Sequence, residues 1–354
     1  MQVYLFLFLV VMLLAFLLSS LSRKLTSRSI HFLYMFFSFP LLGSLAAFRY
    51  DVGVDYKEYE YVFNLVRFSE HKAEPFINLI VYFFSFFTNS NVPVFALLAF
   101  ITVYLFLDFI LKNTHSIFVS FCIFLCFGGF YLGMFNHVRQ FLAVSIFLYS
   151  FKYIRNGSFF SYLVCILIAS SVHYSAVLMV PMYFILKLRL NFRNVLFLIV
   201  CYFIAIGFSE FFIRMTPYAI YLERVVDNER NLYLTVGFVF LSFLYVFLGL
   251  RDKISDTDSI FFYMALISGL LLSSTFVSSL PWNLFFRLNG YFIPYLIIFF
   301  GYLYYRLLRF DVLLSLMYKV LFFVGCYAYL YYSLAVKGSD YNLVPYRTIF
   351  EGGF

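Results

Sequence analysis

Charged residues are scarce in this chain of 354 residues. Asp, Glu, Lys and Arg together make up 12% of it, whereas a typical soluble domain has about 25%. Hydrophobic residues account for 64%, and the mean hydropathy is +0.93. This composition excludes an ordinary water-soluble domain. The net charge is +8, but the basic residues form short clusters between apolar runs, a pattern that indicates membrane orientation rather than nucleic-acid binding.

Several catalytic signatures are also missing. The chain has no Walker phosphate-binding loop, which excludes a P-loop ATPase, and it has no Gly-x-Ser-x-Gly elbow or His-Glu-x-x-His zinc helix. Its five cysteines all lie within apolar runs, and no set of metal ligands accompanies them. We therefore expect packed thiols rather than a disulfide framework or a metal site.

Long apolar runs recur along the whole chain, which is typical of a polytopic membrane protein. No barrel-like alternation is visible, and spanning segments must satisfy their backbone hydrogen bonds internally. We therefore expect an all-α helical bundle that forms a single integral membrane domain over residues 1–354. The runs cover residues 3–18, 30–48, 76–87, 93–111, 117–134, 138–152, 159–172, 174–186, 194–213, 232–250, 259–280, 285–305 and 312–336.

The basic clusters predict which loops face the cytoplasm. An even number of crossings must separate successive clusters, so one run between Arg28 and Lys152 is not a full crossing. The run 76–87 is the shortest, and we expect a re-entrant or interfacial helix there, beside about twelve transmembrane helices. The cytoplasmic clusters are Arg23/Lys24/Arg28, Lys152/Arg155, Lys187/Arg189/Arg193, Arg251/Lys253 and Arg306/Arg309.

This topology sends the unusual polar segments to the outer face of the membrane. We expect residues 49–75 to form an outward-facing functional loop. Residues 337–354 should form an outward-facing tail, and its Tyr341, Tyr346 and Phe350 favour an ordered cap on the outer surface over a disordered end. Both termini would lie outside. The first apolar run is followed, not preceded, by positive residues, which is the reverse of a cleaved signal peptide.

The first polar segment concentrates charge beside a membrane surface, where charge is costly and usually functional. Arg49 precedes a bend at Gly53, and Asp55 follows the bend. The pattern favours a loop that presents a carboxylate and an arginine to a polar substrate, with aromatic rings suited to sugars. An ordinary solvated loop is the alternative. The interleaved tyrosines are Tyr56, Tyr59 and Tyr61.

Three further positions stand out. Arg139-Gln140 opens an apolar run and belongs to a cluster of polar residues. An arginine at a helix end could simply extend to the membrane interface, but that alone would not require so many polar neighbours. His173 lies between two short apolar segments, where an imidazole needs a partner and is a plausible proton acceptor; a structural histidine is the alternative. Arg287 stands in an apolar stretch after Pro281-Trp282, and its planar fork suits a phosphate.

At these residues the chain resembles the EpsG family of bacterial polysaccharide proteins, which groups with Wzy-type O-antigen and capsule polymerases. The resemblance runs along most of the chain in the expected order. The matching positions are Arg49, Gly53, Asp55, Tyr56, Tyr59, Glu74-Pro75, Arg139-Gln140, His173, Arg287 with Tyr291, and Pro345-Tyr346-Arg347.

The resemblance implies a glycosyltransferase of the bacterial inner membrane whose active site faces the periplasm. It implies a donor and an acceptor that are both undecaprenyl-pyrophosphate-linked glycans, with the growing chain transferred to the non-reducing-end sugar of a new repeat unit. It also implies that no metal or other cofactor is needed. The partners expected are these lipid-linked glycans and the bilayer, with a chain-length regulator and a flippase as further candidates.

Without a metal, arginines are the natural clamp for the departing pyrophosphate, so Arg139 and Arg287 are the first candidates and Arg49 the third. The acceptor hydroxyl needs a base, for which Asp55 is the first choice and His173 the second. The expected glycan-binding residues are Tyr56, Tyr59, Glu74, Gln140 and Tyr291.

Two rival classes stay open. One is a transporter or flippase of a lipid-linked sugar, although no internal repeat is visible. The other is a transferase that does not polymerise, such as an O-antigen ligase or a sugar acyltransferase.

Overall fold

A computed structural model describes residues 1–21, 26–68, 73–127, 129–215, 232–252, 259–277, 282–308 and 311–350. Within these ranges the chain is helical and forms no strand beyond one isolated β-bridge. The predicted all-α membrane fold is confirmed. The predicted cytoplasmic residues Arg23, Lys24, Lys253 and Arg309 lie outside the described residues, as do residues 69–72 of the predicted loop and 351–354 of the predicted tail.

Four of the described helices are long and apolar enough to cross a membrane, and they cover residues 2–19, 27–47, 92–113 and 312–337. Seven shorter apolar helices accompany them. Many large apolar side chains are exposed, for example Phe6, Val312 and Leu321, as expected of surfaces that face lipid. Together these features define a polytopic membrane protein, while twelve crossings stay a prediction.

The internal contacts of the chain divide it into two compact units, so the single domain predicted over residues 1–354 also stays a prediction. Unit 1 comprises residues 1–151, 163–177 and 297–354, and unit 2 comprises residues 152–162 and 178–296.

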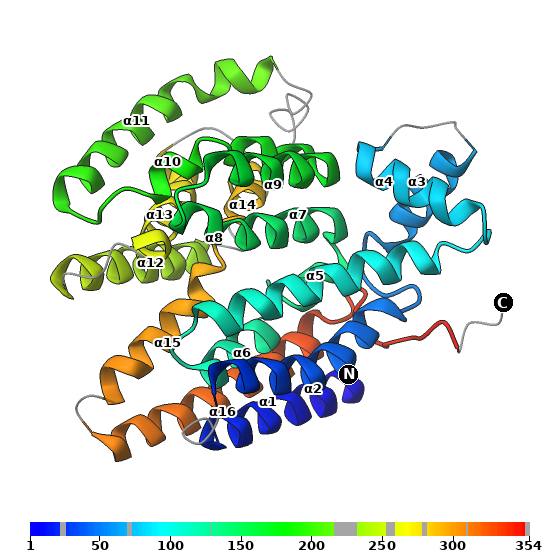
Figure 1. Ribbon diagram of the computed structural model, residues 1–354, viewed down its shortest axis with the longest axis horizontal. Coiled ribbons are helices and arrows are strands. Elements are labelled where there is room, and N and C mark those ends of the chain that lie inside the picture. Colours follow the sequence, from blue (N-terminus) through cyan, green and yellow to red (C-terminus); the bar gives the residue numbers. More distant parts are fainter. Residues whose placement is uncertain are drawn as a thin grey trace. The chain divides into compact units, whose positions relative to one another are not determined.

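Unit 1 (Figure 1) is built on α5, which packs against α2, α4, α6 and α7. The first two helices lie side by side, and the Tyr34 hydroxyl of α2 donates to the Ala15 carbonyl of α1 over 2.8 Å. Helix α6 also packs on α1 and α16. The helices wholly in this unit are α1 (Gln2–Leu21), α2 (Ser27–Ala47), α3 (Tyr56–Arg67), α4 (Pro75–Ser85), α5 (Val92–Asn113), α6 (Ile117–Cys126), η1 (Leu132–Phe135), α7 (Val138–Tyr149) and α16 (Val312–Lys337).

Unit 2 is centred on α13, which packs against α10, α11, α12 and α14. Its helices are α10 (Met182–Leu186), α11 (Phe192–Arg214), α12 (Leu232–Asp252), α13 (Ser259–Val277) and α14 (Trp282–Asn289). Residues of both units occur in α8 (Phe151–Arg155), α9 (Phe159–Val172), η2 (Tyr174–Met179) and α15 (Tyr295–Leu308).

Two local results bear on the site. Helix α4 has 11 residues and so rises only about 16 Å, which agrees with the short element expected over 76–87. The predicted loop 49–75 contains a helix, α3, which buries Tyr56, Tyr59, Phe63 and Val66. Their spacing of three and four residues is that of one helical face, so residues 56–67 of the predicted loop are helical.

Candidate functional site

Arg49 lies just beyond the C-terminus of α2 and is 2% exposed. Its Nη1 donates to the Ala46 carbonyl over 2.6 Å, its Nε donates to Val52 over 3.2 Å, and its Nη2 donates to Phe135 over 3.4 Å. The guanidinium also lies 4.7 Å from the centre of the Phe135 ring. These contacts favour a structural role that joins α2 to η1, and the pyrophosphate role predicted for Arg49 stays untested.

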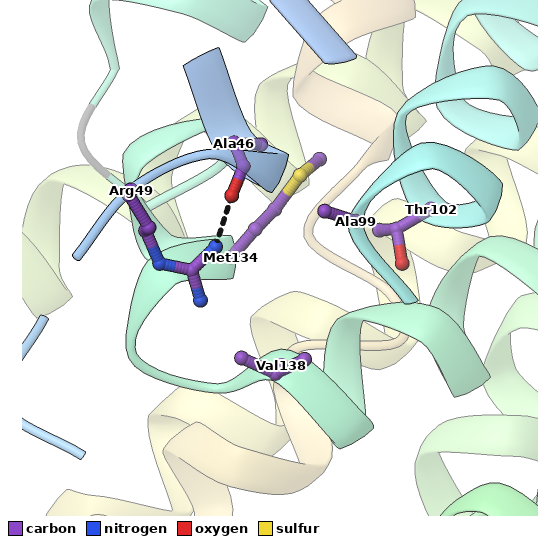
Figure 2. Close-up of a pocket in the computed structure, with 6 residues that line it drawn as sticks. All are labelled: Ala46, Arg49, Ala99, Thr102, Met134 and Val138. Atoms are coloured by element: carbon purple, nitrogen blue, oxygen red, sulfur yellow. Dashed lines mark hydrogen bonds between the residues drawn. The ribbon is translucent and has the colours of Figure 1, made fainter. Parts of the chain in front are cut away.

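Arg49 also lines a small cavity of about 10 Å³, together with Ala46, Ala99, Thr102, Met134 and Val138. Figure 2 shows its guanidinium beside this cavity, with the bond to Ala46 dashed. The volume is near the lower limit for one water molecule. The cavity is therefore too small for a sugar, and the candidate site must be sought in the polar side chains around it.

The chain turns sharply at Gly53, whose φ is +103°. A Cβ built there would stand 2.5 Å from the Phe135 carbonyl oxygen, so only glycine fits without movement. The next amide, at Val54, donates to Asn136 Oδ1 over 2.8 Å. This turn therefore docks the start of α3 against the segment that enters α7.

Asp55 occupies the N-cap position of α3, but its carboxylate makes no capping hydrogen bond. Instead Oδ2 lies 3.7 Å from Nδ1 of His137, the residue before α7. Both side chains are partly exposed. A carboxylate that is positioned and still accessible has the properties of a general base.

Glu74 lies at the start of α4 and receives two partners from distant parts of the chain. Its Oε2 accepts a short hydrogen bond from Arg139 Nη1, and its Oε1 lies 3.4 Å from His173 Nδ1. The Glu74 side chain is 7% exposed, against 27% for Arg139 and 22% for His173. A buried carboxylate thus holds two partly accessible side chains that can donate to a ligand.

The electrostatics of Glu74 fit this arrangement. Burial alone would raise the pKa of its carboxyl, but the hydrogen bond from His173 and the charge of Arg139 outweigh burial and lower it. Glu74 is therefore ionised at neutral pH. Its negative charge fixes the guanidinium of Arg139, whose Nε has no hydrogen-bond partner among the described residues.

Of the predicted glycan-binding residues of unit 1 besides Glu74, Tyr59 lies beside these groups. The Tyr59 ring, on the turn of α3 after Asp55, lies 5.3 Å from the Arg139 guanidinium. Tyr56 is buried and stacks on Phe95 at 4.6 Å, so it contributes packing. Gln140 follows Arg139 in the first turn of α7 and is half-buried.

The starts of α3, α4 and α7 and the end of α9 thus bring together the predicted residues Asp55, Tyr59, Glu74, Arg139 and His173. Arg287 and Tyr291 belong to unit 2, on α14 and just after it, and Tyr291 is fully buried. Their participation beside the unit 1 residues stays a prediction. Among the described residues, no group of three or more His, Cys, Asp or Glu side chains is placed to bind a metal ion.

Sequence reasoning assigned no role to three residues that shape this site. Asn136 and His137 adjoin Arg139 in the sequence, and that proximity to a charged helix start was the available signal. Asn342 lies in the tail, and its side-chain Nδ2 donates to the Asp51 carbonyl over 3.0 Å. Nothing in the sequence near Asn342 indicates that contact.

The helices and the polar cluster describe a polytopic membrane protein with a charged site in unit 1. The model of the EpsG family matches residues 32–348, nearly the whole chain, so the chain belongs to the EpsG family. That family includes Wzy-type polymerase-like proteins, and membership makes this a membrane protein of polysaccharide biosynthesis. No curated protein and no solved structure matches the chain.

Proposed function

We propose that this EpsG-family protein is a metal-independent glycosyltransferase of the bacterial inner membrane. It polymerises undecaprenyl-pyrophosphate-linked repeat units into O-antigen or capsular polysaccharide on the periplasmic face. The observation that carries the proposal is the convergence of Asp55, Glu74, Arg139 and His173, which are up to 118 residues apart in the sequence, through the contacts Asp55–His137, Glu74–Arg139 and Glu74–His173.

The reaction needs a base for the acceptor and positive charge for the leaving group. The acceptor hydroxyl attacks the anomeric carbon of the donor glycan. A new C–O bond forms there, and the bond from that carbon to the pyrophosphate oxygen breaks. The hydroxyl proton moves to Asp55, and the bonding electrons leave with undecaprenyl pyrophosphate.

Asp55 suits the role of base because its carboxylate is accessible and is spared from capping α3. His137 Nδ1 lies 3.7 Å from this carboxylate, on the segment that enters α7. His173 is the second candidate, but its Nδ1 faces Glu74, so only its other ring nitrogen is available to a substrate.

Arg139 suits the role of pyrophosphate clamp. Glu74 binds its Nη1, and the Arg139 side chain is 27% exposed, so the guanidinium is partly accessible to phosphate oxygens. Arg287 lies in unit 2, and its role as a second clamp stays a prediction from the sequence. Glu74 therefore orients Arg139 and His173, which is a different role from the glycan contact predicted from the sequence.

The lipid donor accounts for a charged site in so apolar a protein. Its pyrophosphate stays near the membrane surface because the isoprenoid tail lies in the bilayer, so the side chains that bind it must lie there too. The exposed apolar surfaces of the helices are the surfaces through which such a protein meets lipid.

The test replaces Asp55 by asparagine in cells that lack the wild-type copy, with membrane expression checked. If Asp55 is the base, the long-chain polysaccharide collapses to single repeat units on a gel. Glu58→Gln is the matched control, because Glu58 is an exposed carboxylate in the first turn of the same helix. A normal ladder from Asp55→Asn removes Asp55 from catalysis.

Deletion of the protein separates the rival classes. Single repeats at the surface indicate lost polymerisation, and absence of surface glycan indicates lost export by a flippase. Lipid-linked polymer that is not attached indicates a ligase, and unchanged chain length indicates an acyltransferase.

A further inference from the structure

The C-terminal segment 338–350, here called the strap, lies on the loop that precedes the proposed base. Arg49 and Thr348 form an antiparallel β-bridge. On its two sides, the Ile349 amide donates to Phe48 over 3.0 Å, and the Tyr50 amide donates to Arg347 over 3.0 Å. Residues separated by almost 300 positions are therefore joined through their backbones.

Side chains extend this attachment. Arg347 Nη1 lies 3.2 Å from Asp51 Oδ2, and Lys57 Nζ lies 3.5 Å from the same oxygen. The Tyr346 hydroxyl donates to the Leu45 carbonyl over 2.8 Å. The strap thus contacts the end of α2 and the loop that follows it, and Asp51 of that loop also pairs with Lys57 in the first turn of α3.

Asn342 makes the contacts closest to the base. The Gly53 amide donates to its carbonyl over 2.8 Å, and its Nδ2 donates to the carbonyls of Asp51, over 3.0 Å, and Gly53, over 3.4 Å. Its φ is +49°, a left-handed conformation that asparagine tolerates better than most residues. Asn342 therefore supplies the side-chain donor for these carbonyls and also adopts the left-handed backbone that this position requires.

The turn held by Asn342 also fixes Asp55. Asn136 Oδ1 accepts a hydrogen bond from the Val54 amide. Asn342 bonds to the preceding residues of the turn, because it donates to the Asp51 carbonyl and accepts from the Gly53 amide. The Gly53 carbonyl in turn accepts from the Tyr56 amide over 3.2 Å, which begins α3. Asp55 lies between the hydrogen-bonded residues Val54 and Tyr56, so the position of its carboxylate relative to His137 depends on the bonds made by Asn136 and Asn342.

We propose that the strap is a positioning element of the active site, and that Asn342 is a positioning residue that aligns the Asp55 carboxylate. This inference rests on the proposed function. Misplacing a reacting group by about 1 Å lowers a rate on the order of a hundredfold, so loss of this clamp should impair polymerisation without unfolding the helices.

The first variant is Asn342→Gly, which keeps the left-handed backbone and the bond from Gly53 to the residue 342 carbonyl, and removes only the two side-chain donations. We expect polymer output to fall on the order of tenfold to a hundredfold, with membrane expression and thermal stability in detergent close to wild type. The control is Asp340→Asn, an exposed change in the same segment that leaves the ladder unchanged.

A reversible cross-link separates positioning from folding. Tyr50 and Arg347 are opposite one another beside the Arg49–Thr348 bridge, and the Tyr50 amide donates to the Arg347 carbonyl over 3.0 Å. Opposite residues of an antiparallel pair generally have Cα atoms about 4.5–5.5 Å apart, a separation that a disulfide can span. Tyr50→Cys with Arg347→Cys in the Asn342→Gly chain should form this disulfide, restore polymerisation when oxidised and lose it again on mild reduction. Each single cysteine variant, also in the Asn342→Gly chain, is a control.

The outcomes differ for the two proposals. A normal ladder from Asn342→Gly overturns the positioning role, and so does a loss that tracks a fall in thermal stability and is not restored by the disulfide. If Asp55→Asn polymerises normally while Asn342→Gly does not, the assignment of Asp55 fails and the strap positions a different group. If Asp55→Asn is inactive and Asn342→Gly is normal, the proposed base stands and the strap does not position it.

Discussion

Glu74 and Arg139 should be energetically coupled, and the structure gives the size of the effect. Removing one partner of a fully buried ion pair costs about 3–5 kcal/mol, because a charge is left without compensation. Here Glu74 is buried, but the Arg139 side chain is 27% exposed and water offsets part of the loss. We therefore expect Glu74→Gln and Arg139→Gln each to destabilise the protein by about 2 kcal/mol.

The double variant is the informative measurement. Once Glu74 is gone, losing Arg139 removes no further pairing with it, and once Arg139 is gone, losing Glu74 removes only the contact with His173. The sum of the two single destabilisations should therefore exceed the destabilisation of the double variant by about 1 kcal/mol or more. Thermal unfolding of the four proteins in the same detergent supplies the values. Simple additivity within about 0.5 kcal/mol would refute the argument that this pair is a structural unit.

The same pair predicts a pH dependence. The folded-state pKa of Glu74 is lowered from its ordinary value of 4.5, so the unfolded chain takes up this proton first on acidification. The stabilisation by ionised Glu74 is complete above pH 4.5 and is lost as the pH falls through the lower, folded-state pKa. Glu74→Gln should abolish this part of the acid sensitivity, and an unchanged profile for that variant would assign the sensitivity to other groups.

Three further substitutions test individual contacts. Gly53→Ala should destabilise the loop by about 1–3 kcal/mol and shorten the polysaccharide ladder, because its Cβ would meet the Phe135 carbonyl at a positive φ; wild-type stability would contradict the tight turn. Arg49→Lys should lower thermal stability, because an ammonium cannot reach three carbonyls in the geometry of a guanidinium; a stable variant that fails to polymerise would instead support pyrophosphate binding. Arg287→Lys should strongly reduce polymer length if its planar fork binds pyrophosphate, and a normal ladder would mean that a point charge suffices there.

The sequence predicts the long helices well because their apolar runs are long and uninterrupted. The run 93–111 corresponds to α5, and the run 312–336 corresponds to α16. Other runs are divided: residues 138–152 form α7 and then α8, with Ser150 between them. Hydropathy averages over such breaks and so cannot locate them.

The candidate site is predictable in its members but not in its pairs. Asp55, Arg139 and His173 stand out because ionisable residues are costly near a bilayer. That Arg139 and His173 both bind Glu74 depends on how α4, α7 and α9 meet, and the sequence spacing of 65 and 99 residues carries no such information. The missed helix α3 differs, because its apolar spacing was visible beneath the charges.

The β-bridge between Arg49 and Thr348 has a consequence for biosynthesis. The loop at Gly53 leaves the ribosome long before Asn342, so it must wait for almost 300 further residues to be translated before it can acquire its partner. The geometry proposed for catalysis therefore cannot be completed on the nascent chain while helices are still being inserted. If the proposed function holds, a protein assembled in this order stays inert towards lipid-linked sugars until its strap has reached the same side of the membrane as the loop.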